Sequence, residues 1–389
     1  MHKRMIASGI EALGAVDWDR RLFDALIPLP DGTSYNAYLI RGTDKTALLD
    51  TVDPDKTEVL IEQLADVGHI DYLVCHHAEQ DHSGAIPAVL AAHPETRVVA
   101  SAKCQEMLFD LLGVPPDRVM VVKDNDTLEL GGRSLRFLAL PWVHWPETIV
   151  SWLEPEGILF SCDLFGSHLA TTDLFARPDS VLEPAKRYYA EIMMPFAGLI
   201  RRHLQRLEPL PIRMIAPSHG PLFDHPDLIL SAYRAWVDGP PENRVLLPFV
   251  SMHGSTLAMV EHLTSALAKR AIGLDRFDLV TADLGRLAMS LVDAATIVVA
   301  SPTVLGGMHP LAVSAAYLIN ALKPKARFAS FMGSHSWSAR QTGDVAAMLP
   351  SLSVEVLPPV LVKGLPKAAD FVAIDALADA IATRHANLT

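Results

Sequence analysis

Short apolar runs alternate with helix-like stretches along the chain, and the alternation becomes regular beyond residue 240. In the first part several apolar runs follow one another with no helical stretch between them, which predicts a strand-rich α/β domain. The strands expected there are Tyr38–Ile40, Ala47–Leu49, Tyr72–Val74, Val98–Ala100, Val119–Val122, Leu135–Leu140, Gly157–Phe160 and Met214–Ala216. The helices expected among them include Thr57–Val67 and Pro87–Ala92.

A cluster of turn-forming residues, Asp238-Gly239-Pro240-Pro241-Glu242-Asn243, marks a candidate domain boundary. The strands expected beyond it are Val245–Val250, Leu279–Ala282, Thr296–Ala300, Phe328–Met332 and Val354–Leu357. The helices expected there are Thr256–Arg270, Ala312–Leu322, Ser338–Met348 and Lys367–Thr383. Five strands that alternate with helices predict a doubly wound parallel sheet. We therefore expect two domains, at residues 1–240 and 244–389.

Composition limits the possible classes of function. The 389 residues are 50% hydrophobic and carry a formal net charge of -12, which is typical of a folded protein with enough apolar side chains for two cores. The acidic balance argues against a general nucleic-acid binder, because such proteins need a surplus of Lys and Arg. The longest stretch without charged residues, Ala294–Leu322, is interrupted by Pro302, by Gly306-Gly307 and by Pro310. No membrane span is expected from it.

The cysteines indicate a reducing compartment. Cys75, Cys104 and Cys162 are too few and too odd in number for a disulfide framework. No Cys-x-x-Cys pair occurs in the sequence, so a rubredoxin or zinc-ribbon module built on four thiolates is not expected. Residues 1–5 are basic but are not followed by the apolar core of a signal peptide. The sequence therefore predicts a cytoplasmic protein.

The strongest chemical signal follows directly after an apolar strand, in Cys75-His76-His77-Ala78-Glu79-Gln80-Asp81-His82-Ser83-Gly84. Residues two apart in an extended chain share a face, so His77, Glu79 and Asp81 can converge while His82 follows on the turn. Four imidazole and carboxylate donors within six positions suit iron, manganese or zinc. One such residue alone indicates a hydrated loop, whereas four together predict a metal site.

Three further donors stand at the ends of later apolar strands: His144, Asp163 and His219. Because strand ends lie at the rim of a sheet, side chains from these distant segments can meet. Seven donors exceed what one ion can use while keeping an open position, so they predict two metal ions that share a bridging carboxylate. Asp163 is the candidate bridge.

The order His-x-Glu-x-Asp-His, then His, Asp and Ser-His-Gly, resembles the metallo-β-lactamase-like domain of the flavodiiron proteins, also called A-type flavoproteins. Glu79 stands where the hydrolytic members of that superfamily usually have His. The resemblance implies a non-haem diiron centre. One iron would be bound by His77, Glu79 and His144, the other by Asp81, His82 and His219, with Asp163 as the bridge. All seven positions match the family pattern.

Residues beside these donors also fit the resemblance. His76 lies outside the motif and is interpreted as a packing or hydrogen-bonding neighbour. His168 matches a further feature of the family, and we expect it to form a hydrogen bond near the centre. One of Tyr188 and Tyr189 is a candidate proton donor, since a phenol both donates and accepts, and the sequence does not choose between them. The resemblance covers nearly the whole chain, through Gly32–Ile40, Ala47–Asp50 and Arg187–Ala190.

Three loops in the second part predict a flavin site. Ser251-Met252-His253-Gly254-Ser255-Thr256 joins a strand to a helix, where backbone N–H groups and the helix dipole point at a bound phosphate. The other two are Ser301-Pro302-Thr303-Val304-Leu305-Gly306-Gly307 and Gly333-Ser334-His335-Ser336-Trp337. All three follow strands around one switch point, so this part resembles a flavodoxin domain that holds FMN. No Gly-x-Gly-x-x-Gly fingerprint follows a strand, so a dinucleotide is not expected.

The expected fold is therefore α/β, with a metallo-β-lactamase-like αββα sandwich followed by a flavodoxin-like doubly wound parallel sheet. A flavin passes one or two electrons and a diiron centre stores two more, so the expected activity is the reduction of O2 to water, of NO to N2O, or of both. Two alternatives stay open. A dinuclear zinc hydrolase would use the same seven donors but not the flavin loops, and an FMN electron carrier or redox sensor would not need the donors.

The expected partners follow from the same features. Because the chain has neither a Cys-x-x-Cys module nor a dinucleotide fingerprint, electrons are expected from a separate reductant, either a rubredoxin-type protein or a reduced flavin-type coenzyme. The resemblance implies a homo-oligomer, a head-to-tail dimer or a dimer of dimers, in which the FMN of one chain serves the irons of another. Neither nucleic acid nor a membrane is an expected partner.

Overall fold

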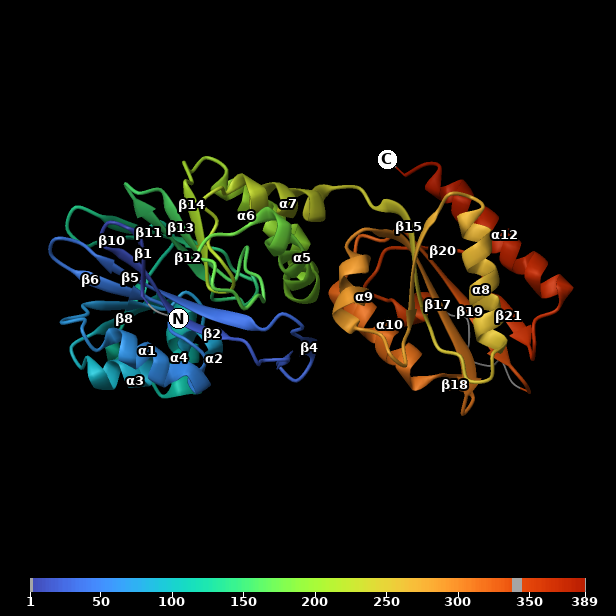
Figure 1. Ribbon diagram of the computed structural model, residues 1–389, viewed down its shortest axis with the longest axis horizontal. Helices are drawn as coiled ribbons and strands as arrows, with labels where there is room; N and C mark the ends of the chain where they lie inside the picture. Colours follow the sequence, from blue (N-terminus) through green and yellow to red (C-terminus); the bar gives the residue numbers. More distant parts are fainter. Residues whose placement is uncertain (1–2, 338–344, 389) are drawn as a thin grey trace. The chain divides into compact units, whose positions relative to one another are not determined.

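The computed structural model describes residues 3–337 and 345–388. The chain divides into two compact units (Figure 1). The first comprises Met1–Tyr189 and Phe196–Val237, and the second comprises Ala190–Pro195 and Asp238–Thr389. Within the described ranges, none of the helices combines the length and the apolar character that crossing a bilayer requires.

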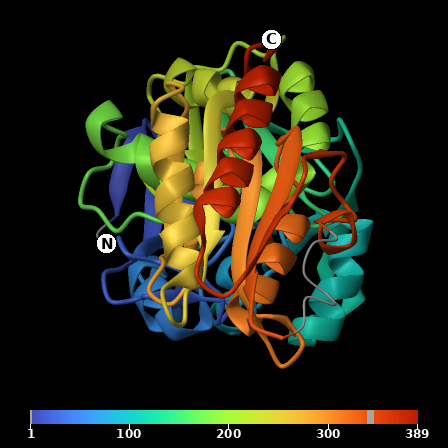
Figure 2. The same ribbon diagram turned by 90° about the vertical axis from the view of Figure 1, so that its right-hand side faces the viewer.

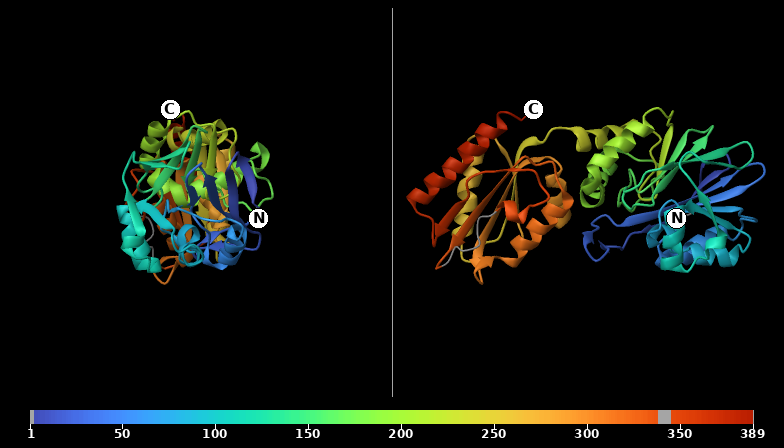
Figure 3. Two further views of the ribbon diagram at one scale, coloured as in Figure 1. Left: turned by 90° about the vertical axis from the view of Figure 1, so that its left-hand side faces the viewer. Right: turned by 180° about the vertical axis from the view of Figure 1, so that it is seen from behind.

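The first unit contains two sheets that face each other (Figures 1 and 3). The strands of the seven-stranded sheet are, in spatial order, β1 (Arg4–Ala7), β2 (Ile10–Asp17), β5 (Thr33–Arg41), β6 (Thr46–Leu49), β7 (Tyr72–Val74), β8 (Arg97–Ser101) and β9 (Val119–Val122). Those of the five-stranded sheet are β10 (Thr127–Glu129), β11 (Ser134–Ala139), β12 (Ile149–Glu154), β13 (Ile158–Cys162) and β14 (Met214–Pro217). A separate hairpin is formed by β3 (Leu22–Phe23) and β4 (Ile27–Pro28).

Strand alternation divides the apolar side chains of the first unit into two layers. Leu39 on β5 belongs to the layer between the seven-stranded sheet and its helices, whereas the neighbouring Tyr38 packs with Phe137 and Phe160 of the other sheet. The helices in the first layer are α1 (Thr57–Leu64), α3 (Ile86–Ala92) and α4 (Ala102–Leu112). The short α2 (Gln80–Ser83) follows β7, and the remaining helices are α5 (Pro178–Tyr188), α6 (Ala197–Leu207) and α7 (Asp227–Asp238).

The helix α6 lies against the five-stranded sheet, because the Arg206 guanidinium donates to the Ala139 carbonyl oxygen at 2.9 Å. On α7, the Tyr233 hydroxyl accepts a hydrogen bond from the Phe165 N–H, just beyond β13. Helices therefore cover the outer face of each sheet. This αββα arrangement confirms the predicted fold class of the first unit.

The second unit is a parallel sheet covered by helices on both faces. Its strands are, in spatial order, β16 (Gly273–Asp278), β15 (Glu242–Phe249), β17 (Ala294–Val304), β19 (Phe328–His335) and β20 (Glu355–Val356). A further strand, β21 (Val360–Lys363), extends the edge beside β19, and β18 (Gly307–Met308) forms a hairpin with β17. Since the second strand in the sequence stands beside the first at one edge, the order is that of flavodoxin-like folds, as predicted.

The helices α8 (Ser255–Ala268) and α12 (Ala368–His385) lie side by side on one face of this sheet (Figure 2). The helices α9 (Leu284–Leu291) and α10 (Pro310–Leu322) cover the other face (Figure 1). Crossovers on both faces are what a doubly wound sheet requires.

One predicted strand is wrong, and one predicted helix lies only partly within the described residues. Leu279–Ala282 forms a turn, and the strand lies just before it, at β16. β16 is a partly exposed edge strand in which Asp275 and Arg276 separate Leu274 from Phe277, so it contains no apolar run. Of the predicted helix Ser338–Met348, residues 338–344 lie outside the described residues, and the described part contains α11 (Val345–Met348).

Candidate metal centre and flavin pocket

The seven predicted donors come from segments that follow strands of both sheets of the first unit. His77 and Glu79 follow β7, and Asp81 and His82 belong to α2. Asp163 follows β13 directly. The last two donors are His144, between β11 and β12, and His219, after β14. The structure brings all seven together.

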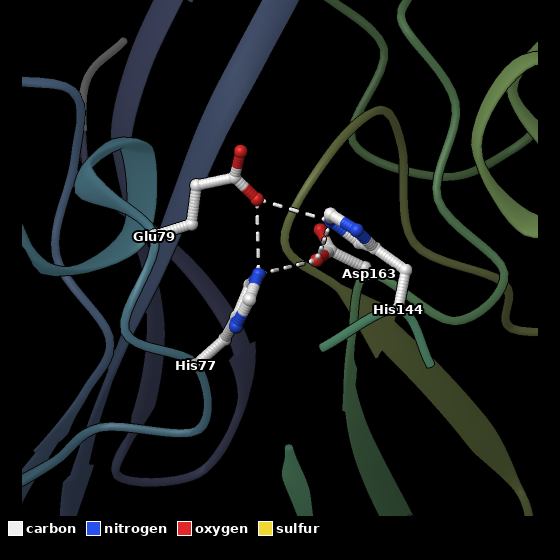
Figure 4. Close-up of side chains that lie close together, drawn as sticks. All are labelled: His77, Glu79, His144 and Asp163. Carbon is white, nitrogen blue, oxygen red and sulfur yellow. Dashed lines mark hydrogen bonds and ion pairs between the residues drawn. The ribbon is translucent and has the colours of Figure 1, made fainter. Parts of the chain in front are cut away.

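Four of the donors form the first group, which Figure 4 shows in close-up. The Nε2 atoms of His77 and His144 both lie 3.0 Å from Glu79 Oε2. The same two atoms lie 3.5 and 3.4 Å from Asp163 Oδ2. Four potential ligand atoms from three different loops therefore converge on one point.

A second group lies on the other side of Asp163. His82 Nε2 lies 3.0 Å from Asp163 Oδ1, and His219 Nε2 lies 3.3 Å from the same oxygen. Asp81 completes the group, with Oδ1 3.3 Å from His82 Nε2 and Oδ2 3.2 Å from His219 Nε2. Asp163 thus directs one carboxylate oxygen to each group, which is the geometry that a bridging ligand needs.

Two of the donor imidazoles have a hydrogen-bond acceptor at Nδ1, the ring nitrogen that faces away from the donor groups. His77 Nδ1 lies 2.7 Å from Glu147 Oε1, and His219 Nδ1 lies 2.7 Å from the carbonyl oxygen of Ser34. An acceptor at Nδ1 leaves Nε2 free of its proton to bind a cation, and it fixes the plane of the ring. Neither partner was predicted from the sequence. Glu147 could have been found from its place three residues after His144, whereas a carbonyl oxygen has no sequence signal.

The structure decides between the two tyrosines. The Tyr188 hydroxyl donates a 2.9 Å hydrogen bond to Asp163 Oδ1. Tyr189 instead packs its ring against Tyr233 and Trp236. Tyr188 is therefore the one that reaches the metal pocket.

His76 and His168, the two histidines expected beside the donor set, are both hydrogen-bonded. His76 Nδ1 lies 2.6 Å from Asp50 Oδ2, and His76 Nε2 lies 2.7 Å from Ser151 Oγ. His168 Nδ1 lies 2.9 Å from Thr33 Oγ1. Because both ring nitrogens of His76 are hydrogen-bonded, neither is available to a metal ion. His76 instead links its loop to Asp50 and Ser151.

Opposite charges face each other throughout the centre. Burial alone lowers the pKa of His144, but the neighbouring carboxylates of Asp163 and Glu79 raise it to about 9. Burial likewise lowers the pKa of His219, and Asp163 and Asp81 raise it to about 10. Burial raises the pKa of Asp163, yet the surrounding imidazoles hold it well below its usual range. Without a metal the donor set is thus a network of imidazoliums and carboxylates.

The donor chemistry fits a pair of divalent metal ions. Asp81 Oδ1, His82 Nε2 and Asp163 Oδ2 are buried and have no hydrogen-bond partner among the described residues. Buried polar atoms normally have partners, so the unpaired atoms in the two groups of donors indicate bound cations. Imidazole nitrogen combined with carboxylate oxygen suits iron, manganese and zinc.

The three predicted flavin loops surround one cavity in the second unit. It has a volume of about 230 Å³ and lies at the carboxyl ends of β15, β17 and β19. Its lining contains Met252, His253, Ser255, Thr256, Pro302, Thr303, Leu305, Gly306, Ser334, His335, Ser336 and Trp337, together with Gly364. Gly364 was not predicted, although a glycine directly after an apolar edge strand is a usable turn signal.

Six predicted flavin residues do not line this cavity: Ser251, Gly254, Ser301, Val304, Gly307 and Gly333. Two of them, Ser251 and Ser301, hydrogen-bond the backbone next to the cavity. Ser251 Oγ accepts a hydrogen bond from the Leu257 N–H, and Ser301 Oγ accepts one from the His309 N–H. Gly254 has a positive φ of 87° where the loop enters α8, a conformation that favours glycine.

Comparison with known proteins covers both units of the chain. Residues 33–220 match the model of the ODP family beta lactamase. The chain is 32% identical to a nitric oxide reductase of Moorella thermoacetica, over 98% of each protein. The structure superposes on rubredoxin oxygen:oxidoreductase of Desulfovibrio gigas with a TM-score of 0.95, at 29% identity and over 99% of both chains. It also superposes on the flavodiiron protein of Giardia intestinalis, with a TM-score of 0.89 at 25% identity. The chain belongs to the flavodiiron protein family.

Membership confirms the resemblance seen in the sequence. This flavodiiron protein is an oxidoreductase of the oxygen and nitric oxide reductase family. Its relatives match over both units, so the family assignment includes the second unit as well as the first. The zinc hydrolase alternative, which needs the first unit alone, loses its support.

Proposed function

We propose that this flavodiiron protein reduces a small oxidised gas, O2 or NO, at two irons held by the seven donors of the first unit. The observation that carries the proposal is the position of Asp163, with one oxygen toward each group of donors. When bound, two irons and an FMN together supply four electrons, which is the number that converts O2 to two waters, whereas two electrons convert two NO to N2O and water.

The chain's own residues determine how a gas reaches this centre. Glu79 and His144 have the most exposed side chains of the donor set, at 10% and 17%, whereas those of the other five donors are 3% exposed or less. Gas entry on the side of Glu79 and His144 follows from this difference. The Tyr188 hydroxyl, which donates a hydrogen bond to Asp163, carries a proton beside the metal centre.

We further propose that FMN binds in the cavity of the second unit. Thr303 Oγ1 and His335 Nδ1 are buried there without a hydrogen-bond partner among the described residues, so a polar ligand would satisfy them. The phosphate would lie at the start of α8, where the N–H groups of the first turn have no intrahelical acceptor. Trp337, which is 92% exposed, would cover the flavin ring.

An absorption spectrum combined with metal analysis of the purified protein tests both proposals. Two irons and one FMN per chain are expected, and both reductase activities are measured on the same sample. Full activity with two zinc ions and no iron would contradict the diiron assignment. An iron-loaded protein without flavin would contradict only the second proposal.

A separate protein or coenzyme would supply the electrons. The related enzyme of Desulfovibrio gigas is named for rubredoxin, and the present sequence contains no Cys-x-x-Cys module of its own. We therefore propose a rubredoxin-type protein or a reduced flavin-type coenzyme as the donor. Rapid oxidation of NADH by the isolated chain would contradict this.

The three cysteines are all free and buried, which supports a reducing, cytoplasmic compartment.

The active unit is proposed to be a head-to-tail homodimer, alone or paired into a dimer of dimers. Leu305 and Trp337, at the mouth of the flavin cavity, are almost fully exposed, and large apolar side chains are depleted from surfaces that stay in water. Charge also supports this pairing. Residues 238–389 hold twelve Lys and Arg and twelve Asp and Glu, so the acidic surplus lies entirely in residues 1–237.

Among the residues that the structure describes, the lining of the cavity contains no carboxylate. The segments 250–257, 301–311, 333–337 and 358–367 contain two lysines, Lys363 and Lys367, and no Asp or Glu. An acidic first unit of a second chain would complement this surface.

A further inference from the structure

Tyr35 on β5 carries a buried hydroxyl. The residue is 1% exposed, and its hydroxyl oxygen has no hydrogen-bond partner among the described residues. Leaving a buried hydroxyl unpaired destabilises the folded state, and phenylalanine would fill the same space without this cost. A role in packing alone therefore does not explain the hydroxyl.

The inner side of Tyr35 faces the metal centre. Its ring meets the ring of His219 edge to face, with centroids 5.9 Å apart. Its neighbour on β5, Ser34, holds the same histidine through its carbonyl oxygen. Asp81, a donor of the second group, is among the charges that act on the Tyr35 hydroxyl. Tyr35 is thus fixed beside the second group of donors.

An ion pair near the surface lies within electrostatic range of the Tyr35 hydroxyl. Arg20 Nη1 lies 3.4 Å from Asp53 Oδ2, and both residues act electrostatically on the Tyr35 hydroxyl, Asp53 most strongly among the charged groups. Pro54, the residue after Asp53, lies so close to Gly84 that a Cβ there would come within 2.6 Å of Pro54 Cγ. Gly84 directly follows α2, the helix that carries Asp81, so the ion pair and the donors belong to adjoining segments.

We propose that Tyr35 relays protons from the Arg20–Asp53 pair to the metal centre, with water completing the steps on either side. The inference rests on the proposed function, in which O2, four protons and four electrons give two waters. The centre is buried, so each electron that enters needs a compensating proton. A phenol hydroxyl accepts one proton as it donates another, so it passes protons without ionising.

The charges around this path suit such a relay. Burial, and then Asp53, raise the pKa of Tyr35 above its usual value, which keeps the hydroxyl protonated. Burial also raises the pKa of Asp53, while the Asp55 N–H and Arg20 lower it and Asp55 and Asp81 raise it. Lys56 and Asp17 form a second ion pair at 3.0 Å, and Asp17 also acts on the Tyr35 hydroxyl.

The test compares Tyr35→Phe with the wild-type holoenzyme. Turnover with O2 or NO is expected to fall roughly tenfold or more, with a larger solvent isotope effect in D2O and unchanged iron and FMN content. The melting temperature is expected to stay unchanged, because phenylalanine fills the same space and no described residue loses a hydrogen-bond partner. Loss of activity at unchanged stability is a signature that a structural role would not produce. Asp53→Asn is expected to slow turnover in the same way.

Two further variants serve as controls. Tyr233→Phe removes another buried hydroxyl, one that accepts a hydrogen bond from the Phe165 N–H, so it should lower stability and leave the isotope effect unchanged. Asp24→Asn tests a competing entry route, because the Asp24 carboxyl lies within the electrostatic reach of Glu79 and His144. If Asp24→Asn slows turnover and Tyr35→Phe does not, the relay through Tyr35 is wrong.

A measurement without gas separates this inference from the proposed function. Iron-loaded protein is reduced chemically in the absence of O2 and NO, and proton uptake is followed with a pH indicator. Slower uptake in Tyr35→Phe supports the relay even if the wild type reduces neither gas, in which case only the proposed function fails. Unchanged uptake and unchanged turnover in a variant that reduces O2 or NO normally would overturn the relay alone.

Discussion

The Tyr188 hydroxyl donates a hydrogen bond of 2.9 Å to Asp163 Oδ1, the same oxygen that faces the second group of donors. Asp163 Oδ2, which faces the first group, has no hydrogen-bond partner among the described residues. The central carboxylate is therefore asymmetric. A tyrosine orients its second side, whereas its first side is held by the metal donors alone.

This asymmetry predicts the effect of Tyr188→Phe. Partners that orient a ligand contribute about 10–100-fold to metal affinity. The variant should therefore bind the second metal ion about tenfold more weakly and the first one nearly normally. Competition with a chelator, read as two separate binding steps, measures this. Equal weakening of both steps would mean that Tyr188 supports the whole carboxylate and not one oxygen.

The position of Asp163 between the groups predicts how many metal ions each donor variant keeps. Asp163→Ala should lose both ions, because each group then lacks one of its carboxylate oxygens. Glu79→Ala should lose the first ion and retain the second, and Asp81→Ala should do the reverse. The ratio of iron to protein, with the FMN content as a control for folding of the second unit, distinguishes these outcomes. Retention of one full ion in Asp163→Ala would exclude the bridge.

How far the sequence predicts this molecule depends on what holds each residue in place. The seven donors could be found because their residue types are rare in apolar surroundings and each follows a strand. Tyr188 and Tyr189 could not be separated, because adjacent residues at the end of α5 point to different sides, one to Asp163 and one to Tyr233. That difference depends on how the chain leaves the helix, which no local pattern records.

Other misses have different physical causes. The strand β16 escaped detection because three of its six residues are charged and their spacing gives neither an apolar run nor a regular alternation. The unpaired hydroxyl of Tyr35 is invisible in the sequence, where the residue reads as one more apolar position of β5. Which side chains are hydrogen-bonded to one another depends on the folded structure and has no signal in the sequence.

The pH dependence of metal binding follows from the protons that the empty donor set carries. His144 and His219, with pKa values of about 9 and 10, are both protonated at pH 7, and a metal ion must displace both protons. Metal affinity should therefore rise between pH 7 and pH 9, by about tenfold per pH unit for each proton released. Calorimetric titration in buffers of different ionisation enthalpy counts the protons. No proton release at pH 7 would show that both imidazoles are neutral in the apoprotein.

The proposed dimer predicts recovery of activity from two inactive variants. Asp163→Ala would lack the metal pair but keep the flavin. Ser255→Asp places a carboxylate at the start of α8, where it favours the helix but repels the phosphate of FMN. Ser265→Asp, near the other end of the same helix, is the matched control for the added charge and should retain flavin.

The two inactive variants are mixed, dissociated and reassociated, and their exchange is confirmed by mass spectrometry. If electrons cross between chains, a mixed dimer contains one flavin site facing one intact metal site. About half of the reassociated molecules are mixed when the two variants are present in equal amounts and pair at random. Each has one working pair of sites instead of two, so about a quarter of the wild-type activity should return. Confirmed exchange with no recovered activity would show that electrons pass within one chain, since neither variant contains both sites.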